Sequence, residues 1–505
     1  MGGQPGRLAP MTAPKTPPAA PASSVAAAGL PPSLAGKRRT PSLTPRLFAA
    51  LTAARAAGTA SRLLGKGGGT QVPGRIARRI DPNVLATLVG GSGVPVVAIT
   101  GSNGKTTTAR FTAELLRGQG VAVNHNSLGS NLIHGVTSLA VAGADLRGRV
   151  AADALVAEVD EGTLLTVLTD LAPRVLVVTE LVRDQLDRFG ELHALGDALA
   201  WVSKQMPADG VVVANADDPL VASFTEEREG RRVTFGLELP GSLDKITRAA
   251  DTIRCPRCRA DLAYRAVYLS HLGDWACTSC GFARPTPDVA VTAVEVTGLA
   301  ETRCTIRLPG GVVHNLVIPQ AGIHIAYDAA AALAALVALD VPTDHAVEIF
   351  STIRPAFGRV EQIALPDGRT VVLAFSKNPT SFNTTFRALA SEGEPKHALM
   401  ALSNTLVDGE DFAWLWDVDV EGVVPLLQDV VVSGTRADEL ATRLKYAGVD
   451  PACMTLIEDR PAALDAALAN VPAGGRLVIV AGYTPTIELR DEMHRRGWTG
   501  RLWEQ

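Results

Sequence analysis

The sequence predicts an α/β protein with two domains, the first interrupted by an insertion that holds four cysteines and the second Rossmann-like. Short apolar runs rich in β-branched residues recur along the chain, and polar loop residues follow each of them. Helical patterns alternate with these runs, which is typical of parallel strands covered by helices on both faces. With 505 residues, 47% of them hydrophobic, the chain is long enough to bury two or three cores.

The beginning of the chain has a composition of its own. Residues 1–45 hold ten of the 32 prolines, with small residues between them, so we predict a disordered tail that cannot offset its ordering entropy. Residues 1–80 contain twelve Lys and Arg and no Asp or Glu. Such a segment is typical of a disordered bacterial tail or of an organellar transit peptide. The other residues carry 36 bases and 52 acids, which argues against a protein that coats nucleic acid.

We expect the first domain to span residues 46–351 and the second to span 352–505, with a change of unit near 354–359. The longest apolar stretch near a helical pattern, Ala329–Leu339, is too short to span a bilayer, and there is no secretory signal, so we expect a protein of the reducing cytoplasm. The predicted strands are Pro95–Thr100, Ala154–Val159, Val175–Val178, Gly210–Ala214, Val371–Phe375, Val430–Val432 and Leu477–Val480, and a further helix is predicted over Thr106–Arg117.

A phosphate-binding loop, TGSNGKTTT, follows the first predicted strand and opens a helix. Glycines let backbone N–H groups approach a phosphate, and the helix N-terminus adds a favourable dipole. Lys105 would reach the β- and γ-phosphates, and the hydroxyl of Thr106 or Thr107 would ligate Mg²⁺. A glycine-rich turn without nucleotide is the alternative, which the strand–loop–helix context disfavours. The residues expected to bind ATP here are Gly101, Ser102, Asn103, Gly104, Lys105, Thr106 and Thr107.

Two cysteine pairs predict a structural zinc site at about residues 250–290. Two residues separate Cys255 from Cys258 and Cys277 from Cys280, and eighteen residues lie between the pairs. Four thiolates at this spacing close a tetrahedral Zn²⁺ site that has no open position. A redox-active pair is the alternative. His271 lies between the pairs, and we expect it to pack rather than to bind the metal.

The loop TGSNGKTTT resembles the ATP-binding loop of the Mur ligases, which activate a carboxylate as an acyl phosphate and then add an amine. Further matches follow in the family's order: EVDE at 158–161, NADDP at 215–219 and GRVE at 358–361. The resemblance implies a central P-loop ATPase domain in which Arg359 helps to bind ATP. It also implies that Glu158 holds Mg²⁺, as suits a hard carboxylate oxygen beside a triphosphate. A charge at a helix start is the alternative for Glu158.

Departures from the ordinary ligases point to one branch, the MurT family of synthetase subunits. RDQLDRFGE at 183–191 replaces the metal-binding histidine motif, and no lysine clearly matches the carbamylated lysine of several members. The similarity runs from about residue 50 to 495 and includes a four-cysteine zinc insertion. The other matching segments are NSLGSNLIHG at 126–135, KNP at 377–379, DGEDFAWLWDVD at 408–419 and SGTRADELATRLKYAG at 433–448.

The resemblance implies an ATP-dependent ligase of peptidoglycan synthesis that amidates the D-Glu α-carboxyl of the lipid II stem peptide. It also implies that the second domain binds a GatD-type glutaminase and completes the Cys–His pair of that partner with an aspartate. We expect Asp411 in this role and Asp408 next, because the family's Asn-Asp before this loop is Asn404-Thr405 here. This chain shows no convincing Cys–His–Glu set of its own, so ammonia must come from elsewhere.

The resemblance also implies an adenine contact at Asp328, where the family has asparagine. Aspartate keeps an acceptor for the adenine amino group but loses the amide donor. A helix N-cap before Ala329 is the alternative for this residue.

Two other functions remain open: an amino-acid-adding Mur or folylpolyglutamate-type ligase, and a non-catalytic zinc-bearing scaffold that binds nucleotide. We expect the protein to act at the inner face of the plasma membrane on membrane-linked lipid II. Residues 1–80 would then be attracted to anionic lipids, or they would form an inert tail.

Overall fold

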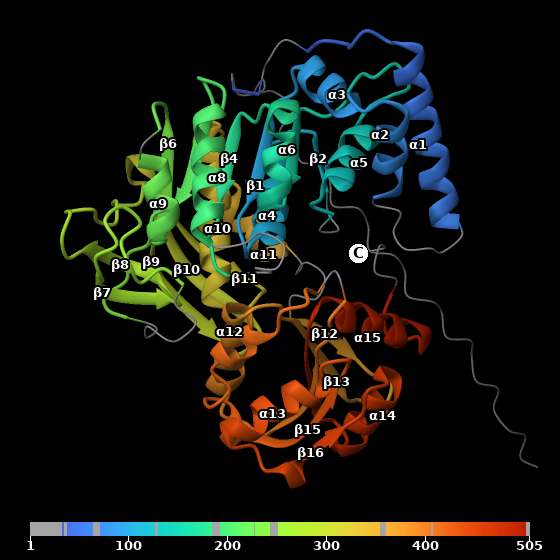
Figure 1. Ribbon diagram of the computed structural model, residues 1–505, viewed down its shortest axis with the longest axis vertical. Coiled ribbons are helices and arrows are strands. Elements are labelled where there is room, and N and C mark those ends of the chain that lie inside the picture. The colour runs from blue at the N-terminus through green and yellow to red at the C-terminus, as the bar shows by residue number, and fades with distance from the viewer. Residues whose placement is uncertain are drawn as a thin grey trace, which may run out of the picture.

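The computed structural model describes residues 33–34, 38–63, 71–126, 130–183, 192–226, 228–242, 251–353, 360–405 and 408–500. Within these ranges the chain forms two large β-sheets with helices on both faces and a small two-stranded sheet (Figure 1). The predicted α/β fold class is therefore confirmed. None of the helices in the described part of the chain is long and apolar enough to cross a lipid bilayer.

The first sheet has nine strands in the order β11-β10-β9-β6-β5-β4-β1-β3-β2. Neighbouring strands run parallel from β2 to β9, and β10 and β11 add an antiparallel edge. The four strands predicted in this domain form as β1, β3, β4 and β5. The strands are β1 (Val96–Thr100), β2 (Val123–His125), β3 (Ala154–Glu158), β4 (Val175–Val178), β5 (Val211–Asn215), β6 (Arg232–Leu237), β9 (Val289–Thr297), β10 (Glu301–Arg307) and β11 (Val313–Ile318).

Alternate residues of the buried strands enter two different cores, which explains their continuous apolar runs. In β1, Val97 and Ile99 pack on the side of α4 and α10, whereas Val96 and Ala98 face the side of α6, α8 and α9. The predicted helices are present as α4 and α10, and α10 begins at Ile323. These helices are α4 (Lys105–Gly118), α6 (Glu161–Leu171), α8 (Leu192–Gln205), α9 (Pro219–Glu226), α10 (Ile323–Ala338) and α11 (Ala346–Thr352).

Four helices lie near the β2 edge of the first sheet: α1 (Pro45–Leu63), α2 (Val72–Ile80), α3 (Val84–Ser92) and α5 (Ile133–Gly143). They share the core of α6 and α8.

Part of the segment predicted to be disordered is ordered. Leu34 is fully buried in the core that contains α10, and Arg38 donates hydrogen bonds of 2.8 and 2.7 Å to the carbonyls of Ala152 and Asp153. The prediction of disorder was therefore wrong for residues 33–34 and 38–45, because one leucine reaches the core and one arginine ties the segment down. Residues 1–32 and 35–37 lie outside the described residues.

Between β6 and β9 the chain forms an antiparallel hairpin, β7 (Leu262–Leu269) and β8 (Leu272–Cys277), which is the small sheet. The four paired cysteines flank this hairpin, so the predicted insertion occupies the expected part of the chain.

The second large sheet has the order β12-β13-β17-β14-β15-β16, with β12 antiparallel at one edge and the other strands parallel. The three strands predicted here lie within β13, β15 and β17. The boundary predicted near 354–359 lies outside the described residues. The strands of this sheet are β12 (Glu361–Ala364), β13 (Thr370–Phe375), β14 (Lys396–Ala401), β15 (Leu427–Ser433), β16 (Met454–Leu456) and β17 (Arg476–Ala481). Its helices are α12 (Pro379–Ser391), α13 (Ala437–Ala447), α14 (Arg460–Asn470) and α15 (Tyr483–Arg495), with the short 3₁₀ helices η2 (Ala413–Asp417), η3 (Val424–Leu426) and η4 (Pro451–Cys453). A further short 3₁₀ helix, η1 (Pro309–Gly311), lies between β10 and β11 of the first sheet.

Candidate active site

The predicted phosphate loop joins the carboxyl end of β1 to the first turn of α4. The loop is fixed to the segment after β4, because Ser102 N–H donates 2.7 Å to the Glu180 carbonyl and Ser102 Oγ donates 3.0 Å to the Val182 carbonyl. Gly104 has a φ of 81°, and a Cβ there would lie 2.3 Å from Asp328 Oδ1. Glycine is therefore required at position 104, both by the backbone conformation and by the close approach of α10.

Lys105 is buried inside this loop. Its Nζ donates to the carbonyls of Gly101 and Ser102, the latter at 3.2 Å, and lies 3.3 Å from Glu161 Oε2. Both side chains of this ion pair are more than nine-tenths buried. Burial raises the pKa of Glu161, and the charges of Lys105 and Lys377 oppose that rise. The sequence analysis did not identify Glu161 as the partner of Lys105, although it lies only three residues after Glu158.

Glu158 ends β3 and is 2% exposed. Its Oε1 accepts a 3.2 Å hydrogen bond from Asn131 Nδ2, and Asn126 holds its backbone through N–H and C=O hydrogen bonds of 2.8 Å each. The alternative of a helix-start charge is wrong, because α6 begins at Glu161 with Asp160 as its N-cap. Glu158 ends the strand next to β1, which leads into the phosphate loop, and a buried carboxylate oxygen is a ligand that Mg²⁺ prefers.

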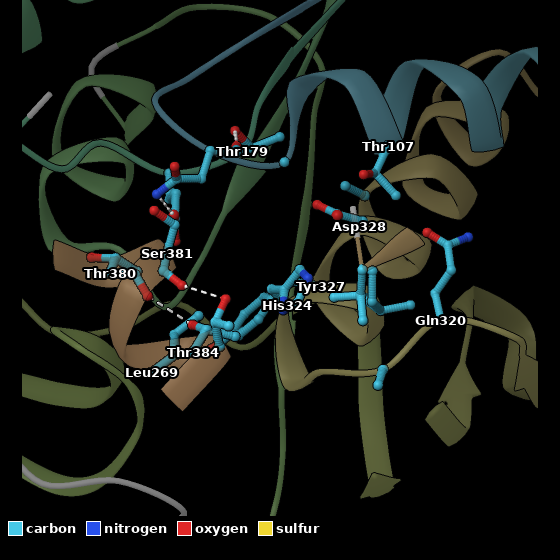
Figure 2. Close-up of a pocket in the computed structure, with 18 of the residues that line it drawn as sticks. Thr107, Thr179, Leu269, Gln320, His324, Tyr327, Asp328, Thr380, Ser381 and Thr384 are labelled. Atoms are coloured by element: carbon cyan, nitrogen blue, oxygen red, sulfur yellow. Dashed lines mark hydrogen bonds between the residues drawn. The ribbon is translucent and has the colours of Figure 1, made fainter. Parts of the chain in front are cut away.

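A cavity of about 870 Å³ leads from the phosphate loop toward the second domain. Figure 2 shows Thr107 and Asp328 on one side of it and Thr380, Ser381 and Thr384 of α12 on the other. Its wall includes the apolar side chains of Phe235, Leu269, Ile325, Tyr327, Val360 and Phe375. An apolar chamber that opens onto a phosphate loop fits the base and ribose of a nucleotide.

Asp328 lies in the second turn of α10, which has Gly322 as its N-cap, so the N-cap alternative for Asp328 is wrong. Its Oδ1 accepts a 3.3 Å hydrogen bond from Thr108 Oγ1. The carboxylate therefore lies at the junction of α4, the loop and the cavity.

One asparagine connects the two domains at this cavity. Asn103 Nδ2 donates 2.7 Å to Glu180 Oε1, and Asn103 Oδ1 accepts a 2.9 Å hydrogen bond from Asn378 Nδ2. Asn378 caps α12 through a capping box with Ser381, so its side chain is held firmly. Burial raises the pKa of Glu180, and the hydrogen bond from Asn103 opposes that rise. Glu180 was not predicted as a site residue, although an acid directly after a buried strand is a signal that could have identified it.

Arg359 and residues 184–191 of the RDQLDRFGE segment lie outside the described residues. Arg183 is described, and it pairs with Asp251 and, at 3.0 Å, with Asp417 of the second domain.

Asp408 and Asp411 line a second cavity of about 620 Å³ together with Arg183, Lys377 and Asp417. Asp408 is half-buried and accepts hydrogen bonds from Thr405 Oγ1 at 2.6 Å and Thr484 N–H at 3.0 Å. Asp411 is exposed, and its Oδ1 accepts a 2.8 Å hydrogen bond from Ala413 N–H.

Tyr483 is the first residue of α15. Its pKa is raised first by burial and then by the charges of Asp408 and Glu158.

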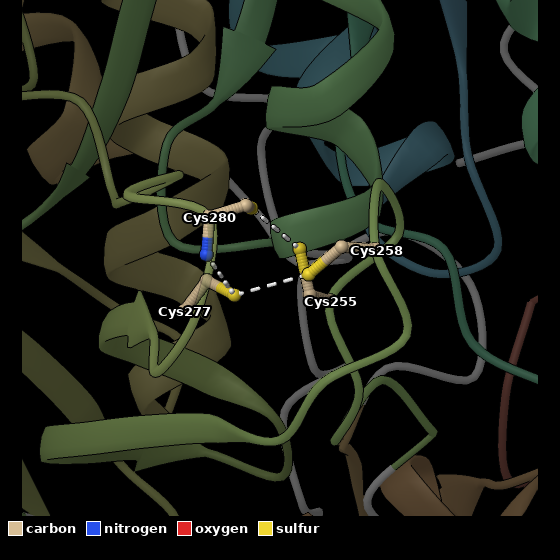
Figure 3. Close-up of side chains that lie close together, drawn as sticks. All are labelled: Cys255, Cys258, Cys277 and Cys280. Carbon is tan, nitrogen blue, oxygen red and sulfur yellow. Dashed lines mark hydrogen bonds between the residues drawn. The ribbon is translucent and has the colours of Figure 1, made fainter.

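The four predicted zinc ligands gather in one cluster. Their sulfur atoms all lie within 4.8 Å of one another, with Cys255 and Cys280 3.6 Å apart and Cys258 and Cys277 3.4 Å apart (Figure 3). Four thiolates around Zn²⁺ at about 2.3 Å stand roughly 3.7 Å from one another, so this donor set fits the metal. Backbone N–H groups of Cys280 and Ser279 lower the pKa of Cys277 to about 6, which favours the thiolate that zinc requires.

His271 lies in the hairpin turn, away from the cluster, and is fully buried. Burial lowers its pKa, but the nearby carboxylate of Asp218, whose Oδ2 lies 3.5 Å from Nε2, outweighs this and, with the charges of Asp251 and Glu180, raises it. The packing role expected for His271 is consistent with this placement.

The hairpin also docks on Asp217. Trp275 Nε1 and Gly273 N–H each donate 3.1 Å to the Asp217 carbonyl. The carboxylate of Asp217 accepts from Arg284 Nε at 2.6 Å, Tyr327 OH at 2.7 Å and Leu237 N–H at 2.8 Å. Since Tyr327 lines the nucleotide cavity, Asp217 links the zinc module to that cavity.

Two family models of known proteins match this chain, one in each domain. The family model of the Mur ligase middle domain matches residues 99–254, and that of the MurT ligase C-terminal region matches residues 375–486. The Staphylococcus aureus (strain N315) protein named lipid II isoglutaminyl synthase (glutamine-hydrolyzing) subunit MurT is 28% identical over 453 residues, covering 89% of this chain and 98% of that protein. Its namesake from Streptococcus pneumoniae (strain ATCC BAA-255 / R6) is 28% identical over 384 residues, covering 76% and 83%.

Solved structures show the same fold. A pseudomurein peptide ligase type C from Methanothermus fervidus has a TM-score of 0.60 at 21% identity, covering 80% of this chain and 79% of that one. MurF from Acinetobacter baumannii has a TM-score of 0.58 at 17% identity, covering 86% and 80%.

Proposed function

We propose that the chain is a MurT-type ATP-dependent ligase, the synthetase subunit of a lipid II isoglutaminyl synthase, because its similarity to proteins of that name covers most of its length. Its substrate would be the α-carboxyl of D-Glu in the stem peptide of lipid II, which it would convert to the amide of D-isoglutamine for peptidoglycan synthesis. The observation that carries this proposal is the single cavity that the phosphate loop shares with α12 of the MurT-type domain.

In the proposed reaction a carboxylate oxygen of the substrate attacks the γ-phosphorus of ATP, and ADP leaves. Ammonia then attacks the acyl carbon of the acyl phosphate, and inorganic phosphate leaves. Lys105 and the N–H groups of the phosphate loop would bind the β- and γ-phosphates, and Lys105 would neutralise charge that develops on the transferred group. Mg²⁺, when bound between the hydroxyl of Thr106 or Thr107 and Glu158, would supply further neutralisation of the triphosphate.

The buried pair of Lys105 and Glu161 supports this assignment. Two carbonyls and one carboxylate occupy the three N–H donors of Lys105, so the lysine would exchange at least one of these partners for a phosphate oxygen when ATP binds, from a position already inside the loop. The hydrogen bond between Asn103 and Asn378 supports an arrangement in which the second domain closes over the same nucleotide. Residues of both domains would therefore exclude water from the acyl phosphate.

The ammonia would come from a GatD-type glutaminase that binds the second domain, to which Asp411, or failing that Asp408, would contribute a carboxylate. A carboxylate in that role orients a catalytic imidazole and stabilises its charged form. Exposure of Asp411 suits a contact with a partner. Asp408 is already bound by Thr405 and Thr484, which suits a residue that shapes the loop.

The test is amidation of lipid II by this chain together with its glutaminase. Lys105→Ala should lower the rate by roughly 10²–10³-fold or more, because a charge aimed at the transferred phosphoryl is lost. The exposed Lys445→Ala is the matched control and should leave the rate unchanged.

Removal of Lys105 alone leaves Glu161 buried without its cation, which could unfold the loop. The double variant Lys105→Ala/Glu161→Gln keeps the site neutral and should be equally inactive while remaining folded. Turnover near the wild-type rate in either variant would disprove the assignment. Incorporation of an amino acid in place of ammonia would indicate an ordinary amino-acid-adding ligase.

A further inference from the structure

Helices α1 and α2 pack side by side and antiparallel at the outer edge of the first domain. Arg46 Nε donates 2.6 Å to the carbonyl of Ile80 at one end, and Gly58 lies against Pro73 at the other. One side of α1 is buried in the domain core, and the other side faces solvent. The buried residues of α1 are Leu47, Ala50, Leu51 and Ala54.

The solvent side carries both cations and apolar side chains. Phe48, Leu43 and Val72 are 46%, 48% and 37% exposed, although each is a large apolar residue. Phe48 and Val72 lie on α1 and α2, Leu43 lies just before α1, and exposed arginines accompany them on the two helices. We call these residues the basic helical face: Arg46, Arg55, Arg75, Arg79, Leu43, Phe48 and Val72.

Helix ends compensate the charge of this face only in part. Arg46 and Arg55 donate to the backbone carbonyls of Ile80 and Ala144 at the C-terminal ends of α2 and α5, which carry the negative end of the helix dipole but no full charge. Among the described residues, no carboxylate forms an ion pair with any arginine of the face. Helices α1, α2, α3 and α5 contain no Asp or Glu, so four positive charges stand together without an internal counter-ion.

We propose that the basic helical face binds an anionic lipid bilayer surface. Exposed arginines beside exposed Phe and Leu side chains can place guanidinium groups at lipid phosphates and apolar side chains among the headgroups. The charge of the rest of the molecule supports this partner, because residues 81–505 carry 36 bases and 52 acids. An anionic surface attracts the basic helical face and repels the remaining body, so it orients the molecule as well as binding it.

The face lies one helix away from the candidate active site. Gly74 of α2 packs so closely on α5 that a Cβ would lie 1.9 Å from the His134 carbonyl. Burial lowers the pKa of His134, and the charges of Arg75 and then Arg78 lower it further. Asn131, three residues before His134, donates to the Glu158 carboxylate at 3.2 Å. Binding through α1 and α2 therefore brings the proposed Mg²⁺ site toward a lipid-linked acceptor. In this step the inference rests on the proposed function.

Vesicle sedimentation of the full chain tests the proposal. The double variant Arg75→Gln/Arg79→Gln changes two arginines for which the described residues supply no hydrogen-bond acceptor, so the fold should be retained. The matched control is Arg265→Gln/Arg495→Gln, which removes the same charge from exposed sites in the zinc hairpin and the second domain. All variants keep residues 1–32, so their basic charges contribute equally.

On vesicles of phosphatidylcholine with about one third phosphatidylglycerol at low salt, each lost arginine should lower the partition coefficient about fivefold, and the double variant roughly 25-fold. The control should bind like the wild type, and Phe48→Ser should also weaken binding. High salt should abolish the difference between the variants.

Equal binding by the double variant and the control would overturn the proposal, as would failure of the wild type to bind anionic vesicles. A second result would also overturn the proposal. If the protein binds vesicles of phosphatidylcholine and a polyprenyl diphosphate that hold no anionic phospholipid, the face binds the substrate instead. Ammonia-dependent amidation of detergent-solubilised lipid II separates the two proposals. The double variant should retain that activity, and a wild type that lacks it would refute the proposed function and leave the vesicle result standing.

Discussion

Replacement of Asp217 by asparagine should be among the most damaging conservative changes in the first domain. The carboxylate is fully buried and accepts hydrogen bonds from Arg284, Tyr327 and Leu237, while the Arg284 side chain is 9% exposed. Asparagine has one acceptor oxygen where aspartate has two, so its NH₂ group must face either the guanidinium or the other two donors. The guanidinium would then be buried without its counter-ion.

Breaking a buried ion pair from one side costs about 3–5 kcal/mol. At roughly 2–4 °C per kcal/mol for a domain of 150–250 residues, the first thermal transition should fall by about 6–20 °C. Asp274→Asn in the hairpin is the matched control, because its partner Arg265 is 82% exposed and such surface pairs contribute about 0–1 kcal/mol. Scanning calorimetry of both variants, with and without ATP, measures the difference.

Since Tyr327 lines the nucleotide cavity, Asp217→Asn should also weaken ATP binding when measured below its transition temperature. The double variant Asp217→Asn/Arg284→Met removes both charges and should recover part of the lost stability. A shift for Asp217→Asn as small as that for Asp274→Asn would refute the reasoning that this carboxylate joins the zinc module to the cavity.

Three further outcomes are expected. Cys277→Ser should lower bound metal from about one Zn²⁺ per chain to near zero and reduce thermal stability, as metal analysis and calorimetry of unchelated protein would show, whereas Cys453→Ser should change neither. Asp411→Asn should lower glutamine-driven amidation by roughly 10²–10⁴-fold and leave ammonia-driven amidation intact; unchanged glutaminase activity in the complex would move the assignment to Asp408. ATP should bind in competition assays better than GTP despite Asp328, and equal competition by GTP would show that the cavity does not select adenine.

The sequence was sufficient to predict the features that depend on local patterns. Apolar β-branched runs located four strands of the first large sheet and three of the second, because a strand buried on both faces needs such a run. The phosphate loop and the cysteine cluster were also predictable, since each depends on residues close together in the chain. The helix-start alternative for Glu158 and the N-cap alternative for Asp328 were excluded only when the ends of α6 and α10 were seen.

What the sequence could not supply were pairings between distant segments. Asn103 and Asn378 are 275 residues apart, and Asp217 meets Tyr327 across 110 residues. Nothing in the local pattern distinguishes these polar residues from solvated ones. The tail prediction failed for a related reason, because the composition of residues 1–45 does not reveal that Leu34 reaches the core.

Most loops of the candidate site follow the carboxyl ends of parallel strands: β1, β3 and β4 in the first sheet, and β13, β14 and β17 in the second. Residues at the ends of strands can bind ligands or take part in catalysis without packing in the hydrophobic core between the sheet and its helices. These residues can therefore be replaced one at a time during evolution while the fold is retained. Asp328 and Thr405, which depart from the pattern of the family, each touch a neighbour that is itself polar, Thr108 and Asp408. Divergence of base preference or of partner choice would thus be recorded at a few polar positions, where comparison across related proteins could trace the order in which the exchanges occurred.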